Sequence, residues 1–129
     1  MKVLIVDDEK VVADSTCEIF RIGGHEPFAA TSASAALELA RTIQPDIVIT
    51  DVVMPGGNGI ELAKAIYREL PKCRVLLISG QAETTNMLEE AARQGVHFEV
   101  LAKPHWPPAL IKKAEEMVGE TNSDAASAP

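Results

Sequence analysis

Five polar side chains of this chain follow or end short apolar runs of sequence. In chain order they are Asp7, Asp8, Asp51, Ser79 and Lys103. Carboxylate oxygens are the ligands that Mg²⁺ prefers, and without a cation three neighbouring carboxylates repel one another. An ammonium and a hydroxyl beside the metal would bind an anion. A phosphoryl group in transfer needs a metal, a lysine, a hydrogen-bond donor and an oxygen nucleophile. The residue types therefore indicate phosphoryl transfer and leave open which carboxylate is the nucleophile.

These side chains can act together only if the elements that carry them lie side by side. The apolar runs are residues 3–6, 28–30, 47–50, 75–79 and 98–102. Stripes of helical periodicity lie between and after them, at 12–22, 33–40, 62–70, 87–91 and 110–118. A strand followed by a helix, five times over, predicts an α/β fold with a parallel sheet between two layers of helices. The carboxyl ends of such strands meet at one edge of the sheet, where ligands bind.

The composition of the runs also predicts the strand order. Residues 3–6, 47–50 and 75–79 are continuously apolar, as in strands that are buried on both faces. Pro27 and Glu99 favour edge positions for the second and fifth runs. The prediction is a doubly wound sheet of order 2-1-3-4-5. Right-handed crossovers then place the first and fifth helices on one face and the second, third and fourth on the other.

The loop after Asp51 is rich in glycine. Gly56, Gly57 and Gly59 predict a turn with positive φ angles rather than a phosphate-binding loop. Asn58 and Glu61 have the spacing of a capping box that opens the next helix.

Length and charge restrict the classes of protein. The 129 residues fit one domain over 1–118, followed by a small, polar stretch at 119–129 that reads as a disordered tail. A net charge of −7 opposes binding to nucleic acid or to an anionic membrane surface. The first apolar run is too short for a signal peptide or a membrane span, and Cys17 and Cys73 form no metal or redox motif. A cytoplasmic location is expected.

Four motifs together carry a family resemblance. They are Val-Leu-Ile-Val-Asp-Asp-Glu at 3–9, Asp-Val-Val-Met-Pro-Gly-Gly-Asn-Gly at 51–59, Ile-Ser-Gly at 78–80 and Ala-Lys-Pro at 102–104. In this order and spacing they resemble the receiver domain of bacterial response regulators, over residues 1–118. The resemblance implies a flavodoxin-like fold and a role in two-component signalling. It also implies that the protein catalyses only its own phosphorylation and dephosphorylation.

The resemblance assigns roles to individual residues. Asp51 is implied to be the phosphoacceptor, taking the group from a histidine of a sensor kinase or a phosphotransfer protein. Asp8, Asp51 and the backbone carbonyl of Val53 are implied to hold Mg²⁺, with Asp7 supporting the metal through water. Ser79 and Lys103 are implied to bind the phosphoryl oxygens.

Output to an unknown protein target is expected through the face formed by the fourth helix, the fifth strand and the fifth helix. Many receivers have an aromatic residue three positions before the lysine, where this chain has Val100. The nearest aromatic residue is Phe98. We expect Ser79 to close on the phosphoryl group and the packing of Phe98 or Val100 to transmit the change.

Three other functions fit parts of the sequence. A degenerate receiver could act as an unphosphorylated scaffold, although every site position is filled. A phosphatase with an aspartyl-phosphate intermediate would need Asp-x-Asp after the first strand, where this chain has Asp7-Asp8-Glu9. A flavin carrier of similar topology would need a phosphate loop there, and Asp7 and Asp8 would repel the phosphate.

Overall fold

The computed structural model describes residues 1–54, 57–79, 89–90, 92–93, 95, 98–102 and 107–126. Five of its strands form one parallel sheet in the order β2-β1-β3-β6-β7. Their bounds are β1 Lys2–Val6, β2 Glu26–Ala30, β3 Ile47–Asp51, β6 Arg74–Ser79 and β7 Glu99–Ala102. A separate antiparallel hairpin consists of β4 (Val53–Met54) and β5 (Gly57–Asn58). With this hairpin set aside, the order is the predicted 2-1-3-4-5.

The positions of the strands agree with their composition. All five residues of β3, at the centre of the sheet, are buried, as its continuously apolar sequence predicts. β2, which contains Pro27, pairs only with β1 and forms one edge. β7 pairs only with β6 and is the last strand on the other side. Proline and a charged residue are tolerated at these places because one side of an edge strand needs no ladder partner.

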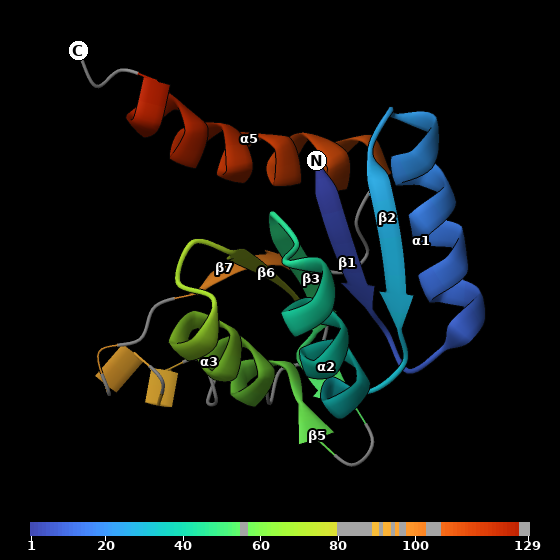
Figure 1. Ribbon diagram of the computed structural model, residues 1–129. Helices are drawn as coiled ribbons and strands as arrows, with labels where there is room; N and C mark the ends of the chain where they lie inside the picture. The colour runs from blue at the N-terminus through green and yellow to red at the C-terminus, as the bar shows by residue number, and fades with distance from the viewer. Residues whose placement is uncertain are drawn as a thin grey trace.

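Helices cover both faces of the sheet (Figure 1). They are α1 (Lys10–Ile22), α2 (Ala33–Ile43), α3 (Gly59–Glu69) and α5 (Pro107–Ala126). Buried residues of α1 and α5 share one apolar cluster with alternate residues of the central strands, such as Ile5 and Ile49. Buried residues of α2 and α3 share the opposite cluster with Leu4 and Val48. The predicted faces are confirmed for these four helices. Only residues 89–90 and 92–93 of the predicted fourth helix region are described, and they are helical.

Side chains cap the starts of α2 and α3, whereas α1 has no side-chain cap. Asn58 Oδ1 accepts a hydrogen bond of 2.8 Å from the backbone N–H of Glu61, which confirms the predicted cap of α3. Ser32 Oγ accepts one of 3.1 Å from Ala35 N and begins α2 in the same way. These caps fix where the two helices begin, just beyond the strand ends.

The structure differs from the sequence prediction at the C-terminus. α5 continues to Ala126, so residues 119–126 are helical rather than the predicted disordered tail. Residues 120–126 contain neither glycine nor proline, and Gly119 alone does not stop a helix that already has a packed first half. Residues 127–129 lie outside the described part of the chain. None of the described helices is long and apolar enough to cross a membrane.

Candidate functional site

The three aspartates predicted to converge do lie together at the carboxyl edge of the sheet. One carboxylate oxygen from each of Asp7, Asp8 and Asp51 lies within 4.8 Å of the other two. Asp7 and Asp8 follow β1, and Asp51 ends β3. These strands are neighbours, with Val6 opposite Thr50. Adjacent parallel strands thus bring residues more than forty positions apart into one cluster.

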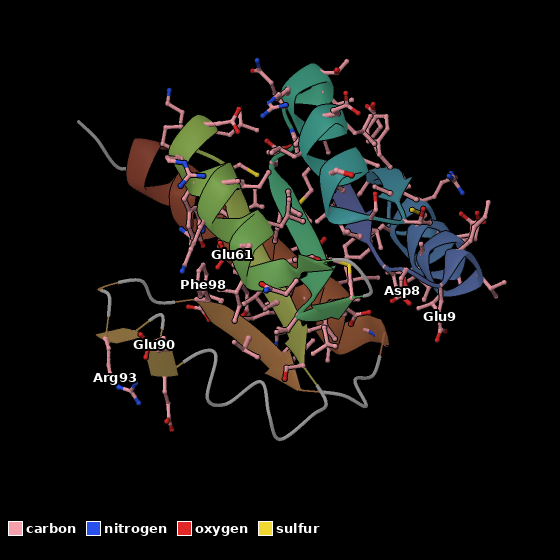
Figure 2. The ribbon with its side chains drawn as sticks, turned by 90° about the horizontal axis from the view of Figure 1, so that it is seen from below. Asp8, Glu9, Glu61, Glu90, Arg93 and Phe98 are labelled. Carbon is pink, nitrogen blue, oxygen red and sulfur yellow. The ribbon has the colours of Figure 1, made fainter. Side chains whose placement is uncertain are left out.

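The three carboxylates differ in exposure and support. Asp7 and Asp51 are 9% and 7% exposed, while Asp8 faces solvent. Asp7 Oδ1 accepts a hydrogen bond of 2.9 Å from Glu9 N, and its own N–H donates to Ala30 O at 3.1 Å. Figure 2 shows Asp8 and Glu9 together where the chain leaves β1 for α1. Asp7 is therefore fixed by hydrogen bonds, Asp51 is buried, and Asp8 is the exposed member of the cluster.

The loop after Asp51 folds back, so that its far end contacts the residue that follows Asp51. Val53 pairs with Asn58 in the β4–β5 hairpin, and Gly59 N donates to Val52 O at 2.8 Å. Val53, whose carbonyl is the expected metal ligand, therefore lies two residues from the phosphoacceptor candidate Asp51 in a closed turn.

Gly59 corrects one sequence prediction. It is the first residue of α3 and is absent from the described glycines with positive φ. A Cβ there would collide with the carbonyl oxygen of Asp51 and lie 3.0 Å from its carbonyl carbon. Gly59 is required by a close approach between the α3 start and the Asp51 backbone, not by an unusual backbone angle. Gly57 belongs to β5, and Gly56 lies outside the described residues.

Ser79 ends β6, one residue beyond Ile78, which is opposite Asp51 in the sheet. It is partly exposed and pairs with Ala102 of β7. Lys103 follows Ala102 directly but lies outside the described residues. The sheet register therefore places the backbone of Ser79 beside the acidic cluster. For Lys103, we expect a position next to Ser79, because the preceding residue, Ala102, pairs with it.

The two candidate switch residues pack on the α3 side of the sheet. Val100 is opposite Leu77, and both Phe98 and Val100 contact the cluster beneath α2 and α3. The ring of Phe98 stacks on Tyr67 of α3, a residue that the sequence analysis did not single out. The sequence does indicate that Tyr67 is partly buried, because it follows Ala63 by one helical turn and lies beside the apolar stripe of α3.

The donor set of the acidic cluster fits a hard divalent cation. Three carboxylate oxygens at these separations can ligate one ion, with water completing the shell, and among the described residues the cluster includes no sulfur or imidazole ligand. A cavity of about 60 Å³ borders Asp7 and Asp51, and its other described lining residues are apolar apart from Thr16. The cluster therefore has room for water on its buried side.

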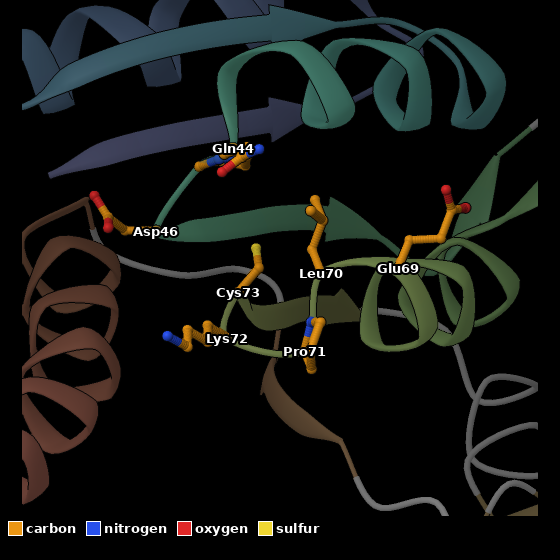
Figure 3. Close-up of a pocket in the computed structure, with 8 residues that line it drawn as sticks. Gln44, Asp46, Glu69, Leu70, Pro71, Lys72 and Cys73 are labelled. Carbon is orange, nitrogen blue, oxygen red and sulfur yellow. The ribbon is translucent and has the colours of Figure 1, made fainter.

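A larger cavity, of about 360 Å³, lies at the opposite edge of the sheet (Figure 3). Its lining includes Gln44, Asp46, Leu70 and Cys73. Burial raises the pKa of the Cys73 thiol to about 12, so this thiol is neutral at ordinary pH. The cavity is thus separate from the acidic cluster and contains no activated nucleophile among its described lining residues.

Comparisons with known proteins agree with this geometry. The family model "Response regulator receiver domain" matches residues 3–115. Sporulation initiation phosphotransferase F of Bacillus subtilis is 32% identical over 105 residues, covering 80% of this chain and 82% of that protein. A receiver domain structure from Clostridium thermocellum superposes with a TM-score of 0.83 at 26% identity, covering 94% of this chain and 96% of that one.

Other relatives are much longer. The uncharacterized transcriptional regulatory protein YesN of Bacillus subtilis is 34% identical over 123 residues. That match covers 92% of this chain but only 33% of YesN. The chain therefore corresponds to one part of such proteins. On the family match, the sheet order and the acidic edge, the chain belongs to the receiver domains of two-component response regulators.

Proposed function

We propose that Asp51 is the phosphoacceptor of this receiver domain, within a functional unit of residues 1–118. The observation that carries the proposal is the position of Asp51, nearly buried at the end of the central strand and within 4.8 Å of two further carboxylates. Asp8, by contrast, is exposed. The family motif at 51–59 supports Asp51 in particular.

The proposed reaction transfers one phosphoryl group. An oxygen of the Asp51 carboxylate attacks phosphorus and forms an acyl phosphate as the phosphorus–nitrogen bond of a phosphohistidine breaks. The released imidazole nitrogen keeps the electron pair of that bond and can take up a proton. Water later attacks the same phosphorus atom, returning the carboxylate and inorganic phosphate. Nothing else is consumed, so the protein catalyses only its own modification.

The cofactor in this proposal is Mg²⁺. Asp8, Asp51 and the backbone carbonyl of Val53 would hold it, with Asp7 supporting the shell through water. Bound there, the ion would offset the negative charge of the carboxylates and of the phosphoryl oxygens in transfer. The cluster members that the structure describes offer only oxygen ligands, which supports this choice.

Ser79 and Lys103 would hold the phosphoryl oxygens. The hydroxyl of Ser79 is a donor at the end of β6, and Lys103 follows the end of β7, the next strand. A lysine is a compact positive charge that suits a phosphoryl group without requiring bidentate geometry.

The proposed partners are a sensor histidine kinase or phosphotransfer protein as donor and a protein as downstream target. The output surface would be the β7–α5 side, where Lys113 Nζ lies 3.0 Å from Glu99 Oε2. Movement of Ser79 would change the packing of Phe98 or Val100. This change would shift the equilibrium between two conformations of the output surface. The net charge of −7 supports a protein target over nucleic acid, and the free thiols Cys17 and Cys73 support a reducing, cytoplasmic location.

Labelling with a small phosphodonor tests the proposal. Wild type and Asp51→Asn are incubated with acetyl phosphate and Mg²⁺, and peptide mass spectrometry locates the acyl phosphate. We expect one phosphoryl group on Asp51 in the wild type and none in the variant. Label on another carboxylate would contradict the assignment. A wild type that stays unlabelled, even with cognate kinase, would favour the unphosphorylated scaffold.

A further inference from the structure

Thr50 occupies an unusual place beside the proposed phosphoacceptor. Its side chain is completely buried, yet it carries a hydroxyl in a strand that is otherwise apolar up to Asp51. That hydroxyl donates a hydrogen bond of 3.0 Å to the backbone carbonyl oxygen of Asp51. A buried hydroxyl is costly unless it is bonded, and this bond gives the Thr50 hydroxyl its partner.

The bond acts where the sheet supports β3 on one side only. The pairing of β3 with β1 ends at Thr50, opposite Val6, while the pairing with β6 continues to Asp51, opposite Ile78. Two further backbone hydrogen bonds hold the chain just beyond Asp51. Val52 N donates to Ile78 O at 3.1 Å, and Gly59 N donates to Val52 O at 2.8 Å.

The start of α3 packs against the Asp51 carbonyl on the side away from the Thr50 hydroxyl. A Cβ at position 59 would collide with the same carbonyl oxygen that the Thr50 hydroxyl contacts, and it would lie 3.2 Å from Thr50 Cγ2. The Asp51 carbonyl is therefore confined between the Thr50 side chain and the bare Cα of Gly59. A carbonyl that cannot rotate fixes the peptide leading to Val52, and through it the next residue, Val53.

We propose that Thr50 is a positioning residue for phosphorylation: through the Asp51 carbonyl it fixes both the nucleophile and the backbone that brings the Val53 carbonyl to the metal. This inference rests on the proposed function for its phosphorylation readout only. Small misplacement of a reacting group lowers the rate of a step whose catalysis is mostly orientation.

Two substitutions separate the hydroxyl from the shape of the side chain. Thr50→Val removes the hydroxyl and keeps the volume, whereas Thr50→Ser keeps the hydroxyl and removes a methyl group. Thr42→Val is the matched control, because the exposed Thr42 hydroxyl bonds only the carbonyl of Glu38, in α2. The readouts are the maximal labelling rate with acetyl phosphate, the donor concentration at half-maximal rate, the affinity for Mg²⁺ alone and the melting temperature.

Positioning predicts a specific pattern. Thr50→Val should lower the maximal rate by about tenfold or more, with little change in the half-saturating donor concentration. It should also weaken Mg²⁺ binding. Thr50→Ser should restore both, although loss of the buried methyl lowers its melting temperature. If rate and Mg²⁺ affinity instead follow melting temperature across the variants, or if Thr50→Val matches wild type, Thr50 only fills space and the proposal is wrong.

Two further measurements test the role of Thr50 when the labelling experiment cannot, either because the wild type is not labelled or because Thr50→Val does not fold. If the wild type is not labelled at all, the proposed function fails, and the ratio of Mg²⁺ affinities between Thr50→Val and Thr50→Ser still decides the role of Thr50. If Thr50→Val does not fold, NMR of the wild type decides it. A slowly exchanging Thr50 hydroxyl proton with scalar coupling to the Asp51 carbonyl carbon is expected, and a rapidly exchanging, uncoupled hydroxyl would overturn the proposal.

Discussion

The ring of Phe98 stacks on the ring of Tyr67, with centroids 5.8 Å apart and planes inclined by only 8°. Tyr67 belongs to α3, while Phe98 directly precedes β7, so the pair joins two elements that flank the candidate switch region. Figure 2 shows Phe98 beneath α3 on the side away from Asp8. An aromatic contact therefore exists near the strand where receivers usually carry an aromatic residue, but it is directed at α3.

Because of this contact, the pKa of the Tyr67 phenol reports on the packing of Phe98 against α3. Burial is the largest cause that raises the pKa of the Tyr67 phenol above its ordinary value of 10.0, with Cys73 and Glu99 adding to the shift and Arg74 opposing it. We expect Phe98→Ala to lower this pKa toward 10, because removing the ring admits water. Tyr67 is the only tyrosine, so absorbance during a pH titration follows it alone.

The same shift predicts a change in stability at alkaline pH. The folded-state pKa lies above the unfolded value, so the neutral phenol favours the folded chain. This contribution is present below pH 10 and is lost as pH rises through the folded pKa. Phe98→Leu, which keeps an apolar cover, is the control and should retain most of the shift. An unchanged Tyr67 titration in Phe98→Ala would show that Phe98 does not shield the phenol.

How far the sequence predicted this site depends on the kind of contact. The acidic cluster was predictable because the apolar runs define strands, and parallel strands bring Asp7, Asp8 and Asp51 to one edge whatever the details of packing. That conclusion depends only on periodicity and topology. Pro27 located an edge strand for a different reason, because proline has no N–H to donate to a second neighbouring strand.

Contacts between side chains from distant elements were not predictable in this way. A glycine selected for close approach looks the same in sequence as one selected for positive φ, so the reason for Gly59 became clear only from the Asp51 carbonyl beside it. Tyr67 and Phe98 are separated by thirty intervening residues, and nothing in either segment specifies the other. The length of α5 was underestimated because a polar sequence without a stop signal is compatible with both helix and coil.

Mg²⁺ should stabilise the wild type more than a variant of the acidic cluster. A ligand at one hundred times its dissociation constant adds about 2.7 kcal/mol to the free energy of unfolding. We expect Asp8→Asn to raise the melting temperature without metal, because it removes one of three repelling carboxylates, and to reduce the increase that Mg²⁺ causes. Thermal unfolding with and without Mg²⁺ measures both effects.

The control for this experiment is Asp14→Asn. Asp14 is an exposed carboxylate of α1 that pairs with Lys10 at 2.7 Å, outside the acidic cluster. Its replacement should leave the response to Mg²⁺ unchanged, since an exposed pair contributes little. Equal Mg²⁺ responses in wild type and Asp8→Asn would exclude Asp8 as a metal ligand.

Gly59→Ala should destabilise the chain by about 1–3 kcal/mol, the usual cost of forcing an extra methyl group into a packed site. The methyl group would collide with the Asp51 carbonyl oxygen, so labelling of Asp51 should slow as well. Gly119→Ala is the matched control within α5, because a Cβ there meets nothing within 4 Å. In that helix, alanine should stabilise by up to about 1 kcal/mol. Chemical denaturation compares the two, and a Gly59→Ala variant as stable as wild type would show that α3 can shift freely away from Asp51.

Cys73 should react slowly with thiol reagents in the folded chain. It is only 5% exposed, and burial raises the pKa of its thiol to about 12, so almost no thiolate is present at pH 8. Cys17 is also buried, and burial raises the pKa of its thiol too. A Cys17→Ala variant isolates Cys73 for a colorimetric thiol assay at pH 8. We expect slow labelling that becomes fast in denaturant, since the unfolded thiol regains an ordinary pKa. Because the thiol borders the cavity between the ends of α2 and α3, labelling of the folded variant as fast as in denaturant would mean that this edge of the sheet opens readily.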